Sequence, residues 1–329
     1  MSSFLDPAIL FFVFGLLAGL VRSNLEIPTQ VARFLSLYLL MSLGLKGGFA
    51  LNASGLTAEV AISLGCALVL AVVVPALGYV LLRRVLDGFN AAAVAATYGS
   101  VSAVTFITAV QYMDTQALPY GGHMAAAMAL MESPAIIMAV LLANLVRHRS
   151  RNTASTASDA SAHPPHASLT RVLHESFTDG AQLLLLGALL VGVLTGASGE
   201  ATMRPFASDL FKGMLAFFLL DMGLQASRHL GSLRGQSPWL LAYAVLGPVA
   251  HSMLALGLAL ALGISEGNTA LLMVLASSAS YIAVPAVVRH AIPEANPSLY
   301  FGMSLGVTFP LNILFGIPFY ISVAHRVVG

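Results

Sequence analysis

Charged residues are scarce in this sequence, and cysteine is almost absent. Only 9% of the 329 residues are Asp, Glu, Lys or Arg, whereas soluble domains carry about 25%. The single cysteine, Cys66, excludes a disulfide framework within the chain and a transition-metal site built from several thiolates. A formal net charge of +1 gives no electrostatic support for a nucleic-acid partner.

Apolar residues dominate instead, with 58% hydrophobic residues and a mean hydropathy of +0.87. A helix needs about 20 mostly apolar residues to cross the hydrocarbon core. Such runs lie near 8–22, 31–52, 57–82, 90–113, 121–146, 172–197, 206–229, 237–263, 268–291 and 298–325. We therefore predict an all-α membrane protein with ten transmembrane helices in contact with membrane lipid. The first run lacks the basic start and cleavage site of a signal peptide, so we expect it to be a retained span.

A polar segment separates the fifth run from the sixth. Residues 147–171 are rich in Ser, Thr and Ala, and such a segment cannot bury enough apolar surface to fold alone. We expect a flexible linker between two five-helix units, residues 1–146 and 172–329.

Basic residues orient the predicted helices, because Lys and Arg concentrate in cytoplasmic loops. Eleven of the 15 lie in or beside the odd-numbered loops: Arg22, Arg33, Arg83, Arg84, Arg147, Arg149, Arg151, Arg171, Arg228, Arg234 and Arg289. The pattern predicts a cytoplasmic linker at 147–171 and both ends of the chain outside.

The two units resemble each other at an offset of about 178 residues. The matching segments are SLGLKGG (42–48) with DMGLQAS (221–227), YGSVSAVTFITAV (98–110) with ASSASYIAVPAVV (276–288), and ESPAII (132–137) with TFPLNI (308–313). Because five spans is an odd number, the second unit would be inserted upside down relative to the first. This is the inverted repeat of secondary transporters.

Serine clusters interrupt the fourth and ninth runs at matching places. Ser100 and Ser102 correspond to Ser278 and Ser280, and Ser277 adds a fifth hydroxyl. A broken helix is tolerated inside a membrane only where it lines a cavity. We predict that helices four and nine are broken and cross, and that their positively polarised N-termini and serines bind a small anion near the midplane. The alternative is that these small residues only allow close helix packing.

One acidic residue, Glu132, lies near the middle of the fifth run. Hard cations prefer oxygen ligands, so Glu132 and Thr105 are candidate sodium ligands. The counterpart of Glu132 in the other unit is Thr308, and Thr308 and Asn312, one turn on, are candidates for further neutral oxygens. The alternative is a protonated Glu132 that donates to a backbone carbonyl.

A second acidic residue, Asp221, lies near the middle of the seventh run. Lys46 lies one turn beyond the repeat counterpart of Asp221. Because a buried carboxylate requires a partner, we expect an Asp221–Lys46 ion pair, with proton coupling as the alternative.

Three motifs carry a family resemblance: AIPEANPSLYFGMS (291–304), GLKGGFAL (44–51) and ESPAIIMAVLLAN (132–144). With them the chain resembles, over all ten predicted spans, the sodium-dependent bicarbonate transporter family of the SbtA type. The resemblance implies a bacterial inner-membrane sodium/bicarbonate symporter that needs Na⁺ and no other cofactor. It also implies core and gate domains that each mix helices of both repeats, a homotrimer, and, as in cyanobacterial members, a cytoplasmic PII-like regulator.

Position by position, the family's bicarbonate pocket falls on the five serines, and its acidic residue before the span-five proline falls on Glu132. Tyr281 stands where cyanobacterial members have an aspartate, so Tyr281 is also a candidate at the coupling-ion site, and sodium and proton coupling both remain open. Two other functions also remain open: symport of another small anion such as a short carboxylate, and anion sensing through the linker. The sequence contains no nucleophile and base at a recognisable catalytic spacing, so we do not expect an enzyme.

Overall fold

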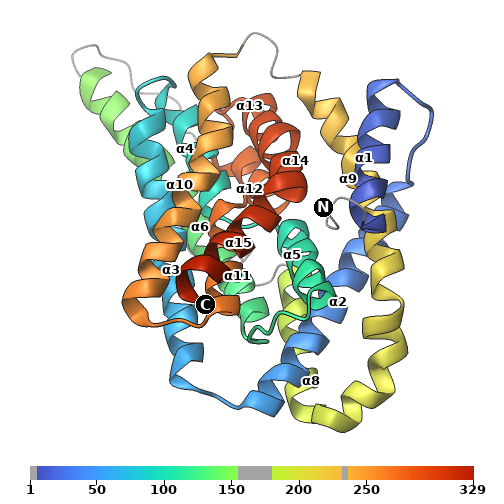
Figure 1. Ribbon diagram of the computed structural model, residues 1–329. Coiled ribbons are helices and arrows are strands. Elements are labelled where there is room, and N and C mark those ends of the chain that lie inside the picture. Colours follow the sequence, from blue (N-terminus) through green and yellow to red (C-terminus); the bar gives the residue numbers. More distant parts are fainter. Residues whose placement is uncertain (1–5, 155–179, 232–235) are drawn as a thin grey trace.

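The computed structural model describes residues 6–154, 180–231 and 236–329, and its regular elements in these ranges are helices (Figure 1). The first unit contains α1 (Pro7–Leu20), α2 (Thr29–Ser54), α3 (Ala58–Leu82), α4 (Gly88–Gly99), α5 (Ala103–Thr115) and α6 (Met124–Ala154). The second contains α8 (Gly180–Arg204), α9 (Phe211–Leu230), α10 (Pro238–Leu262), α11 (Glu266–Ser277), α12 (Ala283–Ala291), α13 (Pro297–Phe301), α14 (Phe309–Leu311) and α15 (Ile317–Val328). The last three helices are joined by π-helical turns at Gly302–Thr308 and Asn312–Gly316.

Seven helical stretches of the described residues are long and apolar enough to cross a membrane. One of them, Gly180–Leu230, has 51 residues and includes both α8 and α9. Helix α1 has 14 residues, and the two halves of the ninth run, α11 and α12, have 12 and 9 residues. The prediction of an all-helical, multi-pass membrane protein is confirmed.

The fifth helix is longer than the sequence predicted. Helix α6 continues to Ala154, so the first eight residues assigned to the 147–171 linker are helical. At the start of this extension the Arg147 guanidinium binds both carboxylate oxygens of Glu294, at 3.0 and 2.9 Å, and the Ala291 carbonyl at 2.8 Å. These contacts hold α6, about two turns before its end, against the end of α12. The rest of the predicted linker lies outside the described residues.

Polar contacts also explain residues 291–304, one of the three motifs that carry the family resemblance. Asn296 caps α13 by accepting the Ser298 N–H, while its own N–H donates to the Asn90 side chain at 2.7 Å. Burial raises the pKa of Glu294, but the hydrogen bonds and charge of Arg147 outweigh it and hold the pKa below its usual range. The motif therefore joins α4, α6, α12 and α13 at one end of the bundle.

Glycines bring two helix pairs into backbone contact, α1 with α9 and α2 with α8. A Cβ atom on Gly15 would lie 2.2 Å from the Leu220 carbonyl oxygen, and one on Gly223 would lie 2.2 Å from that of Phe12. Gly48 meets Leu189 of α8 in the same way. Figure 1 places these four helices together on one side of the molecule. Small residues drive such packing in membranes, where burial from water adds little between helices.

We expect Gly223→Ala to destabilise the protein, because the added methyl group collides with a backbone carbonyl that cannot move freely. Overpacking of this kind costs about 1–3 kcal/mol. The matched control is Gly213→Ala on the same helix, where a Cβ would meet no atom within 4 Å. Thermal unfolding of the purified protein in detergent measures both. Equal unfolding temperatures for the two variants would contradict the packing argument.

Candidate functional site

Helix four is broken between Gly99 and Ala103. Ser100 is extended, and Ser102 caps α5 by accepting the Thr105 N–H on its side-chain oxygen at 3.2 Å. Gly99 is required at the break because a Cβ there would lie 2.5–2.7 Å from ring atoms of Pro75 on α3. The break thus depends on two residues: Gly99, which allows α3 to approach closely, and Ser102, which caps the start of α5.

Helix nine is broken at the corresponding place, between Ser277 and Ala283. Ser278 is extended, and the Ser280 hydroxyl accepts the Val284 N–H of α12 at 3.3 Å. The Ser277 and Ser278 hydroxyls donate to carbonyls of their own helix, those of Val274 and Leu275.

The two breaks lie against each other and satisfy each other's backbone. The Ser102 N–H donates to the Ser278 hydroxyl at 3.0 Å, and the Ser280 N–H donates to the Thr97 carbonyl at 2.8 Å. Because an unpaired amide in a low-dielectric interior is costly, these two hydrogen bonds fix how the broken helices cross.

A cavity of about 220 Å³ adjoins this crossing, and we name it the crossover cavity. It is bounded by α2, α5, α6, α8, α12 and both breaks. Its polar lining consists of Ser36, Ser102, Glu132, Gln182, Ser280 and Tyr281. Ala103 and Ala283, the first residues of α5 and α12, also line it, so both helix N-termini face the same space. A site of this kind suits a small anion.

Three buried hydroxyls surround Ser102 without a hydrogen bond to the described residues, those of Ser100, Thr105 and Tyr281. The Tyr281 side chain lies close to Ser102, and its ring packs edge-on against Phe309 with ring centroids 5.2 Å apart. Native proteins rarely leave buried polar groups unpaired. Of the three residues, only Tyr281 lines the crossover cavity, so its hydroxyl is the one that an ion bound there could reach.

The structure brings only some of the predicted site residues to the cavity. Ser102, Ser280, Glu132 and Tyr281 line it, and Glu132 is half-buried there. Ser278 does not line the cavity, but its hydroxyl accepts the Ser102 N–H and so holds the two breaks together. Sequence reasoning missed Ser36 and Gln182, each a single polar residue in an apolar run.

Three candidates for ion ligands do not line the crossover cavity: Thr105, whose buried hydroxyl lies in the first turn of α5, Thr308 and Asn312. Thr308 shares a 2.6 Å hydrogen bond with the Tyr98 hydroxyl and donates to the Ala244 carbonyl at 2.7 Å. The Asn312 side chain donates to the Ser277 carbonyl at 2.9 Å. Neither lines the crossover cavity, because both join the last helix to its neighbours.

The predicted Asp221–Lys46 ion pair is replaced by other contacts. Lys46 Nζ lies 2.5 Å from Asp114 Oδ2 on α5, and buried Asp221 accepts a 2.6 Å hydrogen bond from Gln225 on its own helix. The prediction treated a repeat counterpart as a spatial neighbour. One further turn along α2 carries Lys46 about 5.4 Å along the helix axis, toward the end of α5.

Broken helices whose N-termini converge on a small cavity that holds several polar side chains, inside a bundle of apolar helices, are the architecture of an ion-coupled membrane transporter. The family comparison agrees. Residues 7–325 match the model of the Na⁺-dependent bicarbonate transporter superfamily, and the chain belongs to this superfamily. A comparison with curated proteins gave no match.

We expect Ser278→Ala to weaken the crossing, because it leaves the Ser102 N–H without an acceptor at a cost of about 1–3 kcal/mol. Ser277→Ala is the matched control, since that hydroxyl donates to the Val274 carbonyl of its own helix and is not part of the two hydrogen bonds that join the breaks. Bicarbonate uptake and thermal unfolding should fall in Ser278→Ala and change little in Ser277→Ala. An unchanged Ser278→Ala protein would show that the hydroxyl does not hold the two breaks together.

Proposed function

We propose that this protein is a secondary active transporter that carries bicarbonate into the cell together with sodium, by alternating access. The observation that carries the proposal is the crossover cavity, where two helix N-termini, serine hydroxyls and one carboxylate meet in a member of this superfamily. Positively polarised helix ends that attract an anion and a carboxylate that attracts a cation are then both available in one small space.

The anion is bound at the N-termini of α5 and α12. A serine hydroxyl has one hydrogen to donate and two lone pairs. Ser102 and Ser280 each use a lone pair to cap their helix, so each keeps its hydrogen for a bicarbonate oxygen. The first-turn N–H groups and the helix dipoles add to the attraction.

The cation is bound beside the anion, with Glu132 as its charged ligand and the Tyr281 hydroxyl as a neutral oxygen, since both residues line the crossover cavity. Sodium bound there neutralises part of the negative charge of bicarbonate and of the Glu132 carboxylate. Coupling follows because the two ions stabilise the same loaded state, and a ligand shifts an equilibrium only through differential affinity. A proton carried by Asp221 is the alternative coupling ion, favoured by the absence of a cation within 4 Å of this buried carboxylate among the described residues.

The proposed architecture is two inverted five-helix repeats with ten spans, and matching contacts support it. Asn90 at the start of α4 accepts the Asn296 N–H, while Asn268 at the start of α11 accepts the Gly121 N–H at 2.7 Å. These asparagines are 178 positions apart, the same offset as the serine pairs. The pairing of α1 with α9 and of α2 with α8 follows the same symmetry.

A gate of α1, α2, α8 and α9 would then hold a core that contains the broken helices. The orientation with both chain ends outside rests on the distribution of basic residues. The bacterial inner membrane, the homotrimer and the PII-like regulator rest on the family resemblance, and they stay predictions.

The test is uptake of labelled bicarbonate into proteoliposomes, with and without an inward sodium gradient. We expect gradient-dependent uptake, and a loss of apparent bicarbonate affinity of about tenfold in Ser102→Ala and Ser280→Ala, since a hydrogen bond to a charged group contributes about 1.5–3 kcal/mol. Counts equal to those of empty liposomes in both conditions would contradict bicarbonate symport. Uptake of a short carboxylate that bicarbonate does not compete with would identify the rival symporter.

Glu132→Gln should weaken the sodium dependence of uptake, because it removes the charged ligand while keeping the size of the side chain. Glu26→Gln, at an exposed position outside the predicted spans, is the matched control. The measurement is the initial uptake rate against sodium concentration. A curve for Glu132→Gln that superimposes on the wild-type curve would return Glu132 to a purely structural role.

A further inference from the structure

A second cavity lies farther along the same helices that bound the crossover cavity. It has a volume of about 350 Å³ and is lined by the later parts of α2 and α5, the loop before α6, the first turn of α6, and the end of α8. The crossover cavity is lined by Leu40 of α2, Val104 of α5 and Met128 of α6. The second cavity is lined by Lys46 and Asp114, which lie farther along α2 and α5. The two cavities therefore follow one another along a single interface.

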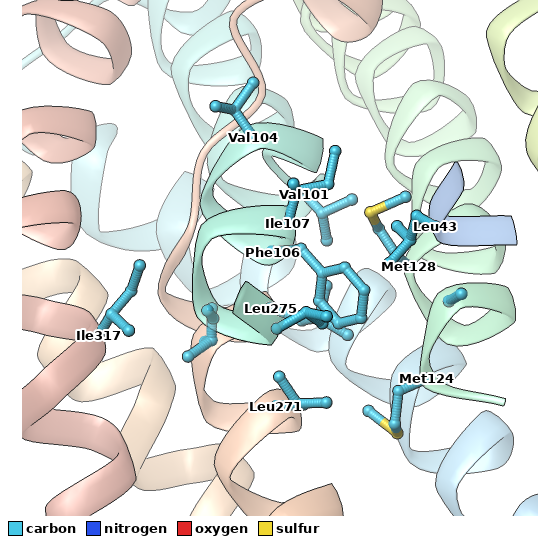
Figure 2. Close-up of a cluster of buried hydrophobic side chains, with 14 of the residues drawn as sticks. Leu43, Val101, Val104, Phe106, Ile107, Met124, Met128, Leu271, Leu275 and Ile317 are labelled. Carbon is cyan, nitrogen blue, oxygen red and sulfur yellow. The ribbon is translucent and has the colours of Figure 1, made fainter. Parts of the chain in front are cut away.

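A hydrophobic barrier separates the two cavities. Figure 2 shows Leu43 of α2, Phe106 of α5, and Met124 and Met128 of α6 together in one cluster. All four side chains are at most 3% exposed. An ion cannot cross such a barrier without losing its hydration, so the second cavity is closed off from the crossover site in this structure.

An ion pair bridges the interface just beyond the barrier. Lys46, one turn past Leu43, contacts Asp114, two turns past Phe106, at 2.5 Å. The Tyr120 hydroxyl donates to the other oxygen of Asp114 at 2.8 Å, and the Lys46 ammonium lies 5.1 Å from the centre of the Phe211 ring of α9. Lys46 thus belongs to the glycine-packed group of α2, α8 and α9, and Asp114 belongs to the broken helix.

We infer that the Lys46–Asp114 ion pair is the latch that keeps the second cavity closed to the crossover site while the crossover cavity is open on its other side. The inference rests on the proposed alternating access. The two side chains are 24% and 31% exposed, and ion pairs so accessible to water contribute little to stability. Such a pair biases an equilibrium between two states without locking it, which a transport cycle requires.

The latch gives Lys46 a role in positioning the two groups of helices, in place of the predicted pairing with Asp221. When the interface opens, Lys46 and Asp114 separate and both face the water of the second cavity. The positively charged Lys46 side chain and the negatively charged Asp114 side chain then lie on opposite walls of the path to the crossover site.

The experiment uses the full chain in vesicles, with thiol accessibility as the readout. Cys66→Ser removes the single native thiol. Val110→Cys then reports on the second cavity, where this position is 1% exposed, and Ala286→Cys reports on the crossover cavity. Labelling rates with a membrane-impermeant thiol reagent are measured in right-side-out and in inverted vesicles.

We expect Lys46→Ala and Asp114→Ala to raise labelling at Val110→Cys and lower it at Ala286→Cys, each by about two- to fivefold, as befits a partly exposed ion pair. The exchanged pair, Lys46→Asp with Asp114→Lys, should return both rates toward wild type, which excludes misfolding as the cause. Lys212→Ala, at an exposed lysine of α9 outside both cavities, is the matched control and should change neither rate.

Unchanged labelling in both single variants would overturn the inference. A rise at Val110→Cys without a fall at Ala286→Cys would also overturn it, since the pair would then hold only local structure. Neither readout depends on which anion is carried or whether sodium drives it, so failure of the latch and failure of bicarbonate symport are distinguishable.

Discussion

The structure depends on how two interrupted helices satisfy their backbone amides inside a membrane. An amide without a partner in hydrocarbon costs several kcal/mol, and each break exposes such groups. Here each break supplies an acceptor to the other, the Ser278 hydroxyl for Ser102 and the Thr97 carbonyl for Ser280. The crossing is therefore held by the same groups that made the interruptions costly.

The same arrangement also creates a candidate ion-binding site. Once the two breaks have bonded each other, the first turns of α5 and α12 still point N–H groups and capping hydroxyls at a common space. Among the described residues, Glu132 from α6 is the one acidic residue that lines this space. Membership of the Na⁺-dependent bicarbonate transporter superfamily agrees with a small space that combines donors for an anion with oxygens for a cation.

The sequence was sufficient for the helices and for the breaks, and insufficient for the contacts between helices. Hydropathy located most of the helical runs within a few residues, because length and apolarity are direct requirements of the bilayer; α6 and α8 end seven or eight residues later than predicted. The breaks were predictable because clustered serines, beside Gly99 in the fourth run and before Pro285 in the ninth, oppose a continuous helix. Ser102, Ser280, Glu132 and Tyr281 were named from the sequence and line the cavity.

Contacts across the repeats could not be read in the same way. An internal repeat states which positions are equivalent, and in an inverted repeat equivalent positions are not neighbours. This is why Lys46 was matched to Asp221 when its partner is Asp114, and why Thr308 and Asn312 were placed with Glu132. Ser36 and Gln182 gave no signal, because one polar residue in an apolar run is as common in packing as in binding.

The contact between Gly99 and Pro75 constrains how this family can vary. The proline ring occupies the volume that a side chain at position 99 would need, so the two positions share one space. A larger residue at either position is tolerable only if the other shrinks or the third helix moves away. Related chains are therefore expected to change these two positions jointly or to keep both, although they lie 24 residues apart in the chain.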